Sequence, residues 1–139
     1  MALVCPQQVT LYQAGDVIEG ASFNNFLDAL DAHYCTYEGG DEKTQDAIYS
    51  DPSGGYQGSE ACGGIAAAYV ISSSYGYNEA AGTPFYEMRQ CHEYLKLGLQ
   101  GTTFVYSSGD NGVAGNGGQC IDASTGSYNN GRIPCPKYC

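Results

Sequence analysis

Two short apolar runs with a well-marked helix between them constrain the fold more than any other feature of the sequence. The runs, Ala66–Gly76 and Gly101–Gly109, are rich in β-branched or aromatic residues and end in small residues. Their centres are continuous rather than alternating, which is typical of strands covered on both faces of a parallel sheet. Parallel neighbours need a crossover connection, and the helix between the runs supplies it.

The helix between the two runs carries clear signals at both ends. Thr83 is a favoured N-cap residue, and Pro84 suits the first helical position, where its missing N–H costs nothing. Gly101 follows the last apolar residue, as glycine commonly does just after a helix. Helical spacing predicts a buried stripe made of Met88, Cys91, Leu95 and Leu99.

The first third of the chain shows a similar strand followed by a helix. Gln7–Gly15 is another apolar run, and Ser22 is a favoured N-cap for a helix over residues 23–34. The order strand, helix, long loop, strand, helix, strand predicts an α/β fold with a parallel sheet and right-handed crossovers. Apolar residues at helical spacing predict the buried face of the first helix: Phe23, Phe26, Leu27, Leu30 and Tyr34.

Seven cysteines in 139 residues indicate an oxidising compartment. The CxxC pairs typical of zinc sites are absent from the sequence, so we expect disulfides and no metal site. Cys35 and Cys62 stand at the two ends of a long glycine-rich loop, and a bridge between them is one hypothesis. A second hypothesis pairs Cys91 with Cys120. Both stay open, because a sequence does not fix disulfide connectivity.

The charge balance excludes several classes of partner. Fifteen acidic residues face five basic ones, giving a net charge of -10, so nucleic acids and anionic membranes would repel the chain. No stretch approaches the roughly 20 apolar residues of a membrane span. With the cysteines, this predicts a secreted, extracellular protein whose signal peptide is not in this chain, since the N-terminus lacks a basic start and a long apolar run.

A candidate site lies where two of the predicted strands end. In an open α/β sheet, ligands bind beyond the carboxyl ends of the strands. The segments SSSYGYNE and SSGDNG follow the second and third apolar runs, and the latter contains Asp110. From turn chemistry alone, Asp110 has an alternative interpretation as a turn aspartate that caps a glycine-rich loop.

These loops, with the helix between them, resemble the sedolisin family of serine-carboxyl peptidases, and most closely its fungal branch similar to tripeptidyl peptidases. The matching stretches include VTLYQAGD, QDAIYSDPSGGYQGSEACG, VISSSYGYNEA, TPFYEMRQCHEYLKLGLQG and YSSGDNGVAGNGGQCID. They cover most of Val9–Asp122. The resemblance therefore predicts that residues 1–122 are the central part of a sedolisin-like peptidase domain, as an internal fragment, and that residues 123–139 are an irregular tail.

The resemblance implies a subtilisin-like fold and peptide hydrolysis at acidic pH by a serine nucleophile assisted by a glutamate and an aspartate. A further aspartate, in the family's SxGDxG motif, serves the oxyanion hole, and here it is Asp110. A carboxylic acid that stays protonated at low pH can donate a hydrogen bond to the developing oxyanion. The family's SxS[WY]G strand lies along the substrate backbone, which implies substrate-binding roles for Ser72, Ser74, Tyr75 and Gly76, with Gly109 beside Asp110.

Other parts of the family's machinery have no match. The family's E-x-x-x-D motif normally precedes the matched stretch, and the GTS motif of its nucleophile is not found here. We therefore expect this chain alone to be inactive. The family's calcium site has no counterpart, so no cofactor is expected, and the expected partner is a peptide or protein substrate. The alternative is a catalytically inactive truncated product or a non-enzymatic secreted binding module.

Overall fold

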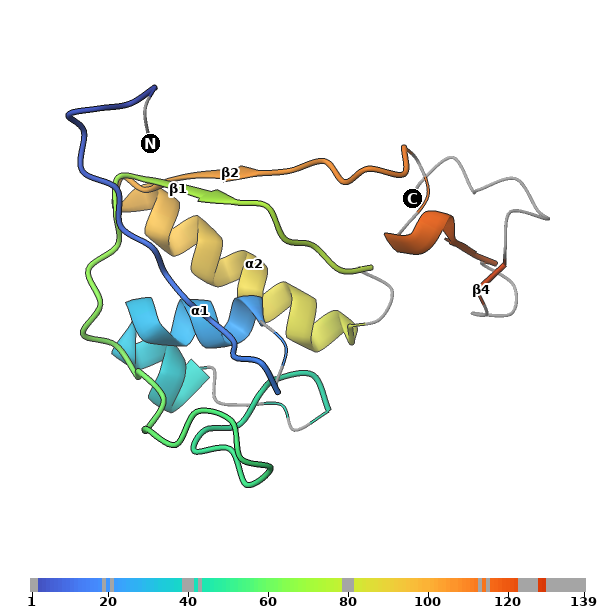
Figure 1. Ribbon diagram of the computed structural model, residues 1–139, viewed down its shortest axis with the longest axis horizontal. Coiled ribbons are helices and arrows are strands. Elements are labelled where there is room, and N and C mark those ends of the chain that lie inside the picture. Colours follow the sequence, from blue (N-terminus) through green and yellow to red (C-terminus); the bar gives the residue numbers. More distant parts are fainter. Residues whose placement is uncertain are drawn as a thin grey trace. The chain divides into compact units, whose positions relative to one another are not determined.

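The computed structural model describes residues 3–18, 20, 22–38, 42, 44–78, 82–112, 114, 116–122 and 128–129. The chain divides into two compact units, Met1–Ala66 and Ala67–Cys139. We call them the first and the second unit, and their helices and strands are labelled in Figure 1.

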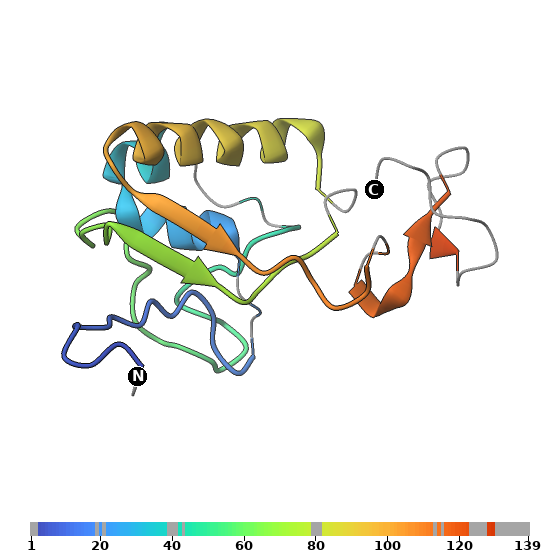
Figure 2. The same cartoon turned by 90° about the horizontal axis from the view of Figure 1, so that it is seen from above.

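The second unit contains the predicted pair of parallel strands. Strand β1, Val70–Ser73, pairs in parallel with β2, Thr103–Tyr106, with Val70 opposite Thr103 and Ser73 opposite Tyr106. Helix α2, Pro84–Leu99, connects them. Figure 2 shows the two arrows side by side and pointing the same way. This β-α-β element confirms the α/β class, and its strands are shorter than the apolar runs.

The predicted ends of α2 are confirmed. The Thr83 side chain accepts a hydrogen bond from the Tyr86 N–H at 3.2 Å, and Pro84 occupies the first turn. At the other end Gly101 adopts φ 102°, which glycine alone adopts without strain. Its conformation lets the Thr102 N–H donate to the Leu97 carbonyl at 3.1 Å, so a helix carbonyl left over at the end is satisfied.

The predicted buried stripe of α2 is wrong. Met88, Leu95 and Leu99 are 60%, 61% and 82% exposed, and Cys91 is exposed as well. The β2 rings contact Tyr94 instead, with Phe104 at 4.9 Å between ring centroids. Such contacts select the neighbouring face of the helix. The residues that this face buries are Tyr86, Gln90, Glu93 and Leu97.

Glu93 lies on that buried face and forms an ion pair within the helix. Its carboxylate is 2.6 Å from the Lys96 ammonium one turn along α2. An ion pair offsets much of the cost of taking a carboxylate out of water. A periodic apolar pattern thus shows that a helix has two faces, whereas the contacts with the neighbouring strand decide which face is buried.

In the first unit, the predicted helix is shorter than expected. Helix α1 spans Phe23–Leu30, and the Ser22 side chain caps it by accepting from the Asn25 N–H at 3.1 Å. Asp31 then adopts an extended backbone, and its carboxylate accepts from the N–H groups of His33 and Tyr34 at 2.7 and 3.2 Å. Asp31 therefore caps a new turn, which leads into the π-helix η1, Tyr34–Glu38.

The predicted face of α1 is partly confirmed. Leu27 and Tyr34 are fully buried, whereas Phe23, Phe26 and Leu30 are half-buried.

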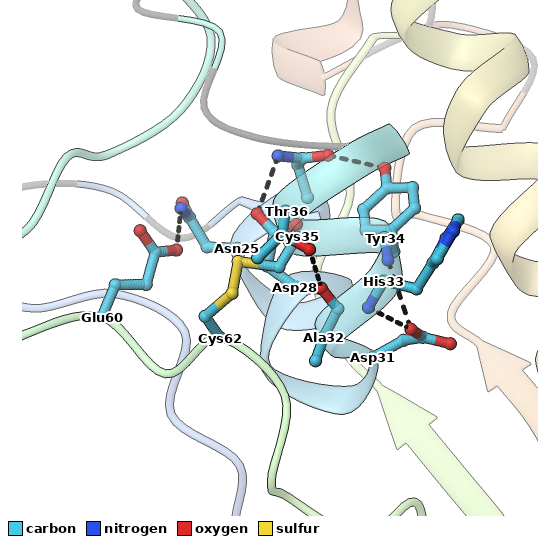
Figure 3. Close-up of a disulfide and its surroundings, with 11 residues drawn as sticks. Asn25, Asp28, Asp31, Ala32, His33, Tyr34, Cys35, Thr36, Glu60 and Cys62 are labelled. Carbon is cyan, nitrogen blue, oxygen red and sulfur yellow. Dashed lines mark hydrogen bonds between the residues drawn. A yellow bond between two sulfur atoms is a disulfide. The ribbon is translucent and has the colours of Figure 1, made fainter.

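The disulfide between Cys35 and Cys62 is confirmed and shown in Figure 3. The hypothesis that Cys91 pairs with Cys120 is wrong. Cys91 is a free thiol on the exposed face of α2, whereas Cys120 is 2% exposed and disulfide-bonded. Because Cys91 carries a free thiol and the Cys120 sulfur is already in a bridge, the two do not form a disulfide with each other. Cys135 and Cys139 lie outside the described residues.

The predicted first strand, Gln7–Gly15, is not a strand. The sheets among the described residues are β1–β2 and a short antiparallel pair, β3 (Cys120–Ile121) with β4 (Tyr128–Asn129). An apolar run becomes a strand only when a ladder satisfies its backbone. This segment is instead held by Tyr12, whose hydroxyl donates to the Ala66 carbonyl at 2.9 Å. Strand β4 lies in the predicted irregular tail, and residues 123–127 and 130–139 lie outside the described residues.

Candidate functional site

The two predicted site loops leave the same edge of the β1–β2 pair. Ser73 lies opposite Tyr106 at the ends of the strands, and the Ser107 N–H donates to the Ser73 carbonyl at 3.0 Å. Because the strands are parallel, the segment after each begins at this edge, as Figure 2 shows. The structure therefore brings the starts of the SSSYG and SSGDN segments together.

The segment after β1 presents polar and aromatic groups to solvent. Ser72, Ser74 and Gly76 are exposed, and Tyr75 is 41% exposed. Within the described sheets, β1 pairs with β2 alone. Its other edge therefore offers backbone N–H and C=O groups in the spacing that an extended peptide needs.

Helix α2 anchors the same segment. The Tyr77 hydroxyl donates to the Gln90 side-chain carbonyl at 3.1 Å, and Gln90 is 3% exposed. The Tyr75 ring lies 6.4 Å from the Tyr77 ring. The aromatic part of the predicted substrate wall is thus attached to a helix rather than carried on an unsupported loop.

The segment after β2 turns sharply through glycines. Gly109 and Gly112 have φ values of 76° and 62°, a backbone region that disfavours other residues. Asp110 stands between them and is exposed. Among the described residues its carboxylate accepts no hydrogen bond, including from the Gly112 N–H two positions on, which a turn-capping aspartate would use.

Tyr106, the last residue of β2, stays protonated well into the alkaline range. Burial raises the pKa of its phenol above the ordinary value of 10.0, and the neighbouring Tyr94 partly offsets this rise. The Tyr106 ring stacks at 6.4 Å from Phe104 and meets Tyr94 edge-on at 5.8 Å. An aromatic cluster therefore holds β2 directly before the Asp110 loop.

One pair in the first unit has the spacing of the family's catalytic carboxylates. Glu42 and Asp46 form an E-x-x-x-D sequence, although it lies within the matched stretch rather than before it. Asp46 is 8% exposed, and it accepts from the Ser22 hydroxyl at 2.6 Å, the Asn24 amide at 3.1 Å and the Glu42 N–H at 2.8 Å. These contacts assign Asp46 to the buried hydrogen-bond network of the first unit.

Sequence reasoning missed a cleft in the first unit that brings Asp16 and Glu60 together. Because 44 positions separate them, no local motif contains both. The glycine-rich stretch DPSGGYQG before Glu60 was the available signal.

No group of three or more His, Cys, Asp or Glu side chains is placed to hold a metal ion within the part of the chain that the structure describes. In the same part of the chain, no helix is both long and apolar enough to cross a membrane.

Comparisons with known proteins match nearly the whole chain. It is 43% identical to aorsin of Aspergillus oryzae over 98% of this chain and 22% of that protein. It is 46% identical to tripeptidyl-peptidase SED1 of Arthroderma otae over 86% of this chain and 18% of that protein. It is 40% identical to tripeptidyl-peptidase sed1 of Aspergillus fumigatus over 84% of this chain and 18% of that protein.

No family model and no solved structure matches the chain. The chain spans about a fifth of the length of the curated relatives it matches. At 40 to 46% identity, these relatives confirm the predicted resemblance: by sequence, the chain belongs with the sedolisin family of peptidases, as the homologue of one stretch of their length.

Proposed function

We propose that this chain supplies the oxyanion aspartate and part of the substrate wall of a secreted serine-carboxyl peptidase that hydrolyses peptides at acidic pH. The identity to aorsin and the tripeptidyl-peptidases supports peptide hydrolysis. The observation that carries the assignment of the site is the parallel pairing of β1 with β2, which starts both motif loops at one edge.

The proposed role of Asp110 is to donate a hydrogen bond. At acidic pH its carboxylic acid points a proton at the oxygen on which negative charge develops during attack on the peptide carbonyl. Asp110 is exposed and accepts no hydrogen bond among the described residues, which leaves the group available to a substrate. Gly109, with φ 76°, gives the backbone turn that presents it.

The proposed substrate wall is the segment that continues β1. An extended peptide laid along Ser72 and Ser74 pairs with the exposed backbone edge, and Tyr75 and Gly76 border its path. Ser72 of β1 lies opposite Val105 of β2, so the substrate wall and the Asp110 loop continue from two paired strands. The wall needs no cofactor from this chain.

A chimera tests this function directly. The matched stretch of tripeptidyl-peptidase SED1 of Arthroderma otae is replaced by residues 9–122 of this chain, and cleavage of an unblocked peptide is measured at about pH 4, near the ordinary carboxyl pKa values. We expect activity from the chimera. We expect none from the isolated chain, which lacks the GTS motif. A correctly folded but inactive chimera, or turnover by the isolated chain, contradicts the proposal.

A further inference from the structure

We propose that the first unit binds an organic cation, an ammonium or guanidinium group, in the cleft lined by Asp16, Glu60, Tyr49 and Tyr56. The cleft has a volume of about 440 Å³, within the range of small-molecule sites. This proposal goes beyond the peptidase function and does not rest on it, because binding is measured without turnover.

The charge of the cleft is negative. Asp16 and Glu60 line it, and no Lys, Arg or His is among the described residues that do so. The pair of carboxylates therefore attracts a positive group and repels an anion.

Hydrogen bonds from N–H groups hold both carboxylates in place. Asp16 accepts from the N–H groups of Ile18 at 2.7 Å and Tyr56 at 2.5 Å. Glu60 accepts from the Asn25 side-chain amide at 2.5 Å, as Figure 3 shows. Asn25 is itself 5% exposed, and its amide also donates to the Ala47 carbonyl at 3.1 Å. These N–H groups orient the carboxylates and carry no charge of their own.

Two tyrosine rings also line the cleft. The rings of Tyr49 and Tyr56 meet edge-on, with 5.8 Å between centroids and an interplanar angle of 74°. The face of a tyrosine ring attracts ammonium and guanidinium groups. Carboxylates with aromatic faces favour an organic cation, and a pair of carboxylates supplies too few ligands for a calcium ion, which takes 6–8 oxygens.

Two glycines let the loop form this wall. A Cβ on Gly58 would collide with the Tyr56 ring, and a Cβ on Gly55 would collide with the carboxylates of Asp16 and Asp51. Tyr56 therefore packs directly over the backbone at Gly58, and the loop closes tightly on Asp16. The glycines of the GGYQG stretch thus allow the Tyr56 ring and the Asp16 carboxylate to lie close to the loop backbone.

The test is calorimetric titration of the full chain with three blocked probes at about pH 7, where ordinary carboxyl groups are ionised. N-acetyl-arginine amide carries a basic side chain and no free amine. Triglycine amide carries a free amino terminus and no basic side chain. N-acetyl-norleucine amide is the neutral control. We expect at least one cationic probe to bind and norleucine not to bind.

The probes distinguish the sources of the cation. Binding of the arginine probe alone identifies a basic side chain, and binding of triglycine amide alone identifies a peptide amino terminus. Failure of both cationic probes, or equal binding of norleucine, overturns the proposal. If the chimera shows no peptidase activity but the full chain still binds a cationic probe, the proposed function fails and this inference stands.

Isosteric variants locate the site. Asp16→Asn and Glu60→Gln each keep an oxygen acceptor and remove one charge, so we expect each to weaken binding about tenfold or more. Glu42→Gln is the matched control, because it removes one charge from the same unit outside the cleft and keeps the acceptor of the Thr44 N–H. Equal weakening by all variants means diffuse attraction and contradicts a site in the cleft.

Discussion

The turn aspartates of the first unit are held by their own backbone, whereas Asp110 of the second unit is not. Asp16, Asp31 and Asp51 each accept a hydrogen bond from the N–H two residues further on, at 2.7, 2.7 and 2.6 Å. Asp110 has Gly112 at that position and makes no such bond. The aspartates at turns thus divide into structural caps and an available carboxyl group.

This difference weakens the alternative interpretation of Asp110 as a turn cap. A capping aspartate stabilises its turn by satisfying a backbone donor. An aspartate in a glycine-rich loop that satisfies no described donor contributes little to the fold, so it is available to a ligand.

The largest loss of stability is expected for Asp46→Ala. The change removes the acceptor of the Ser22 hydroxyl, the Asn24 amide and the Glu42 N–H. Leaving buried donors without partners lowers the free energy of unfolding by about 3 kcal/mol. Urea unfolding of the full chain, followed by circular dichroism, measures the change. A loss below about 0.5 kcal/mol, the size of an ordinary surface effect, contradicts the structural role.

A smaller loss is expected for Asp51→Ala. Asp51 is 1% exposed, and its carboxylate accepts from the N–H groups of Ser53 and Gly55 at 2.6 and 3.3 Å. We expect a cost of about 1–2 kcal/mol, the scale of a lost cap. Asp51→Asn keeps an acceptor oxygen and should restore most of the difference in the same unfolding experiment. Equal losses for both variants would mean that the charge, and not the turn, matters.

The signals that sequence reasoning interpreted correctly are local. Thr83 and Gly101 act on N–H and carbonyl groups within one turn, so the ends of α2 were predictable. The buried face of α2 depends on the contact with Phe104 of β2, which the apolar pattern does not contain.

The interpretation of Gln7–Gly15 failed for a similar reason, since a strand requires a partner. The positions of Ser72 and Asp110 at one edge followed from parallel topology, whereas the Asp16–Glu60 cleft depends on a fold of the loop that spacing does not encode.

A weak pH dependence is expected from Tyr106. Because the pKa of its phenol is raised in the folded chain, the unfolded phenol ionises first as pH rises. The contribution of the Tyr106 phenol to the free energy of unfolding is therefore fully present below about pH 10 and is lost as the pH rises further. Since Tyr106 is 39% exposed, the slope is small. Tyr106→Phe should flatten the alkaline limb of the unfolding curve relative to the wild-type chain, and an unchanged limb would exclude Tyr106 as its source.

Almost no effect on stability is expected for Asp110→Ala. The free energy of unfolding should change by less than about 0.5 kcal/mol, as for an exposed residue without a partner. A loss as large as that of Asp51→Ala in the same urea experiment would show that Asp110 is a structural cap.

The activity of the chimera with Asp110→Ala tests the central claim most directly. The change removes the hydrogen-bond donor, which the amide of an asparagine would keep, and Asn111→Ala in the same loop is the control. The account predicts a fall in kcat of about 10²–10³-fold, the cost of one oxyanion donor, with an unchanged melting temperature and a fully active control. A chimera that keeps its full activity with Asp110→Ala contradicts the account.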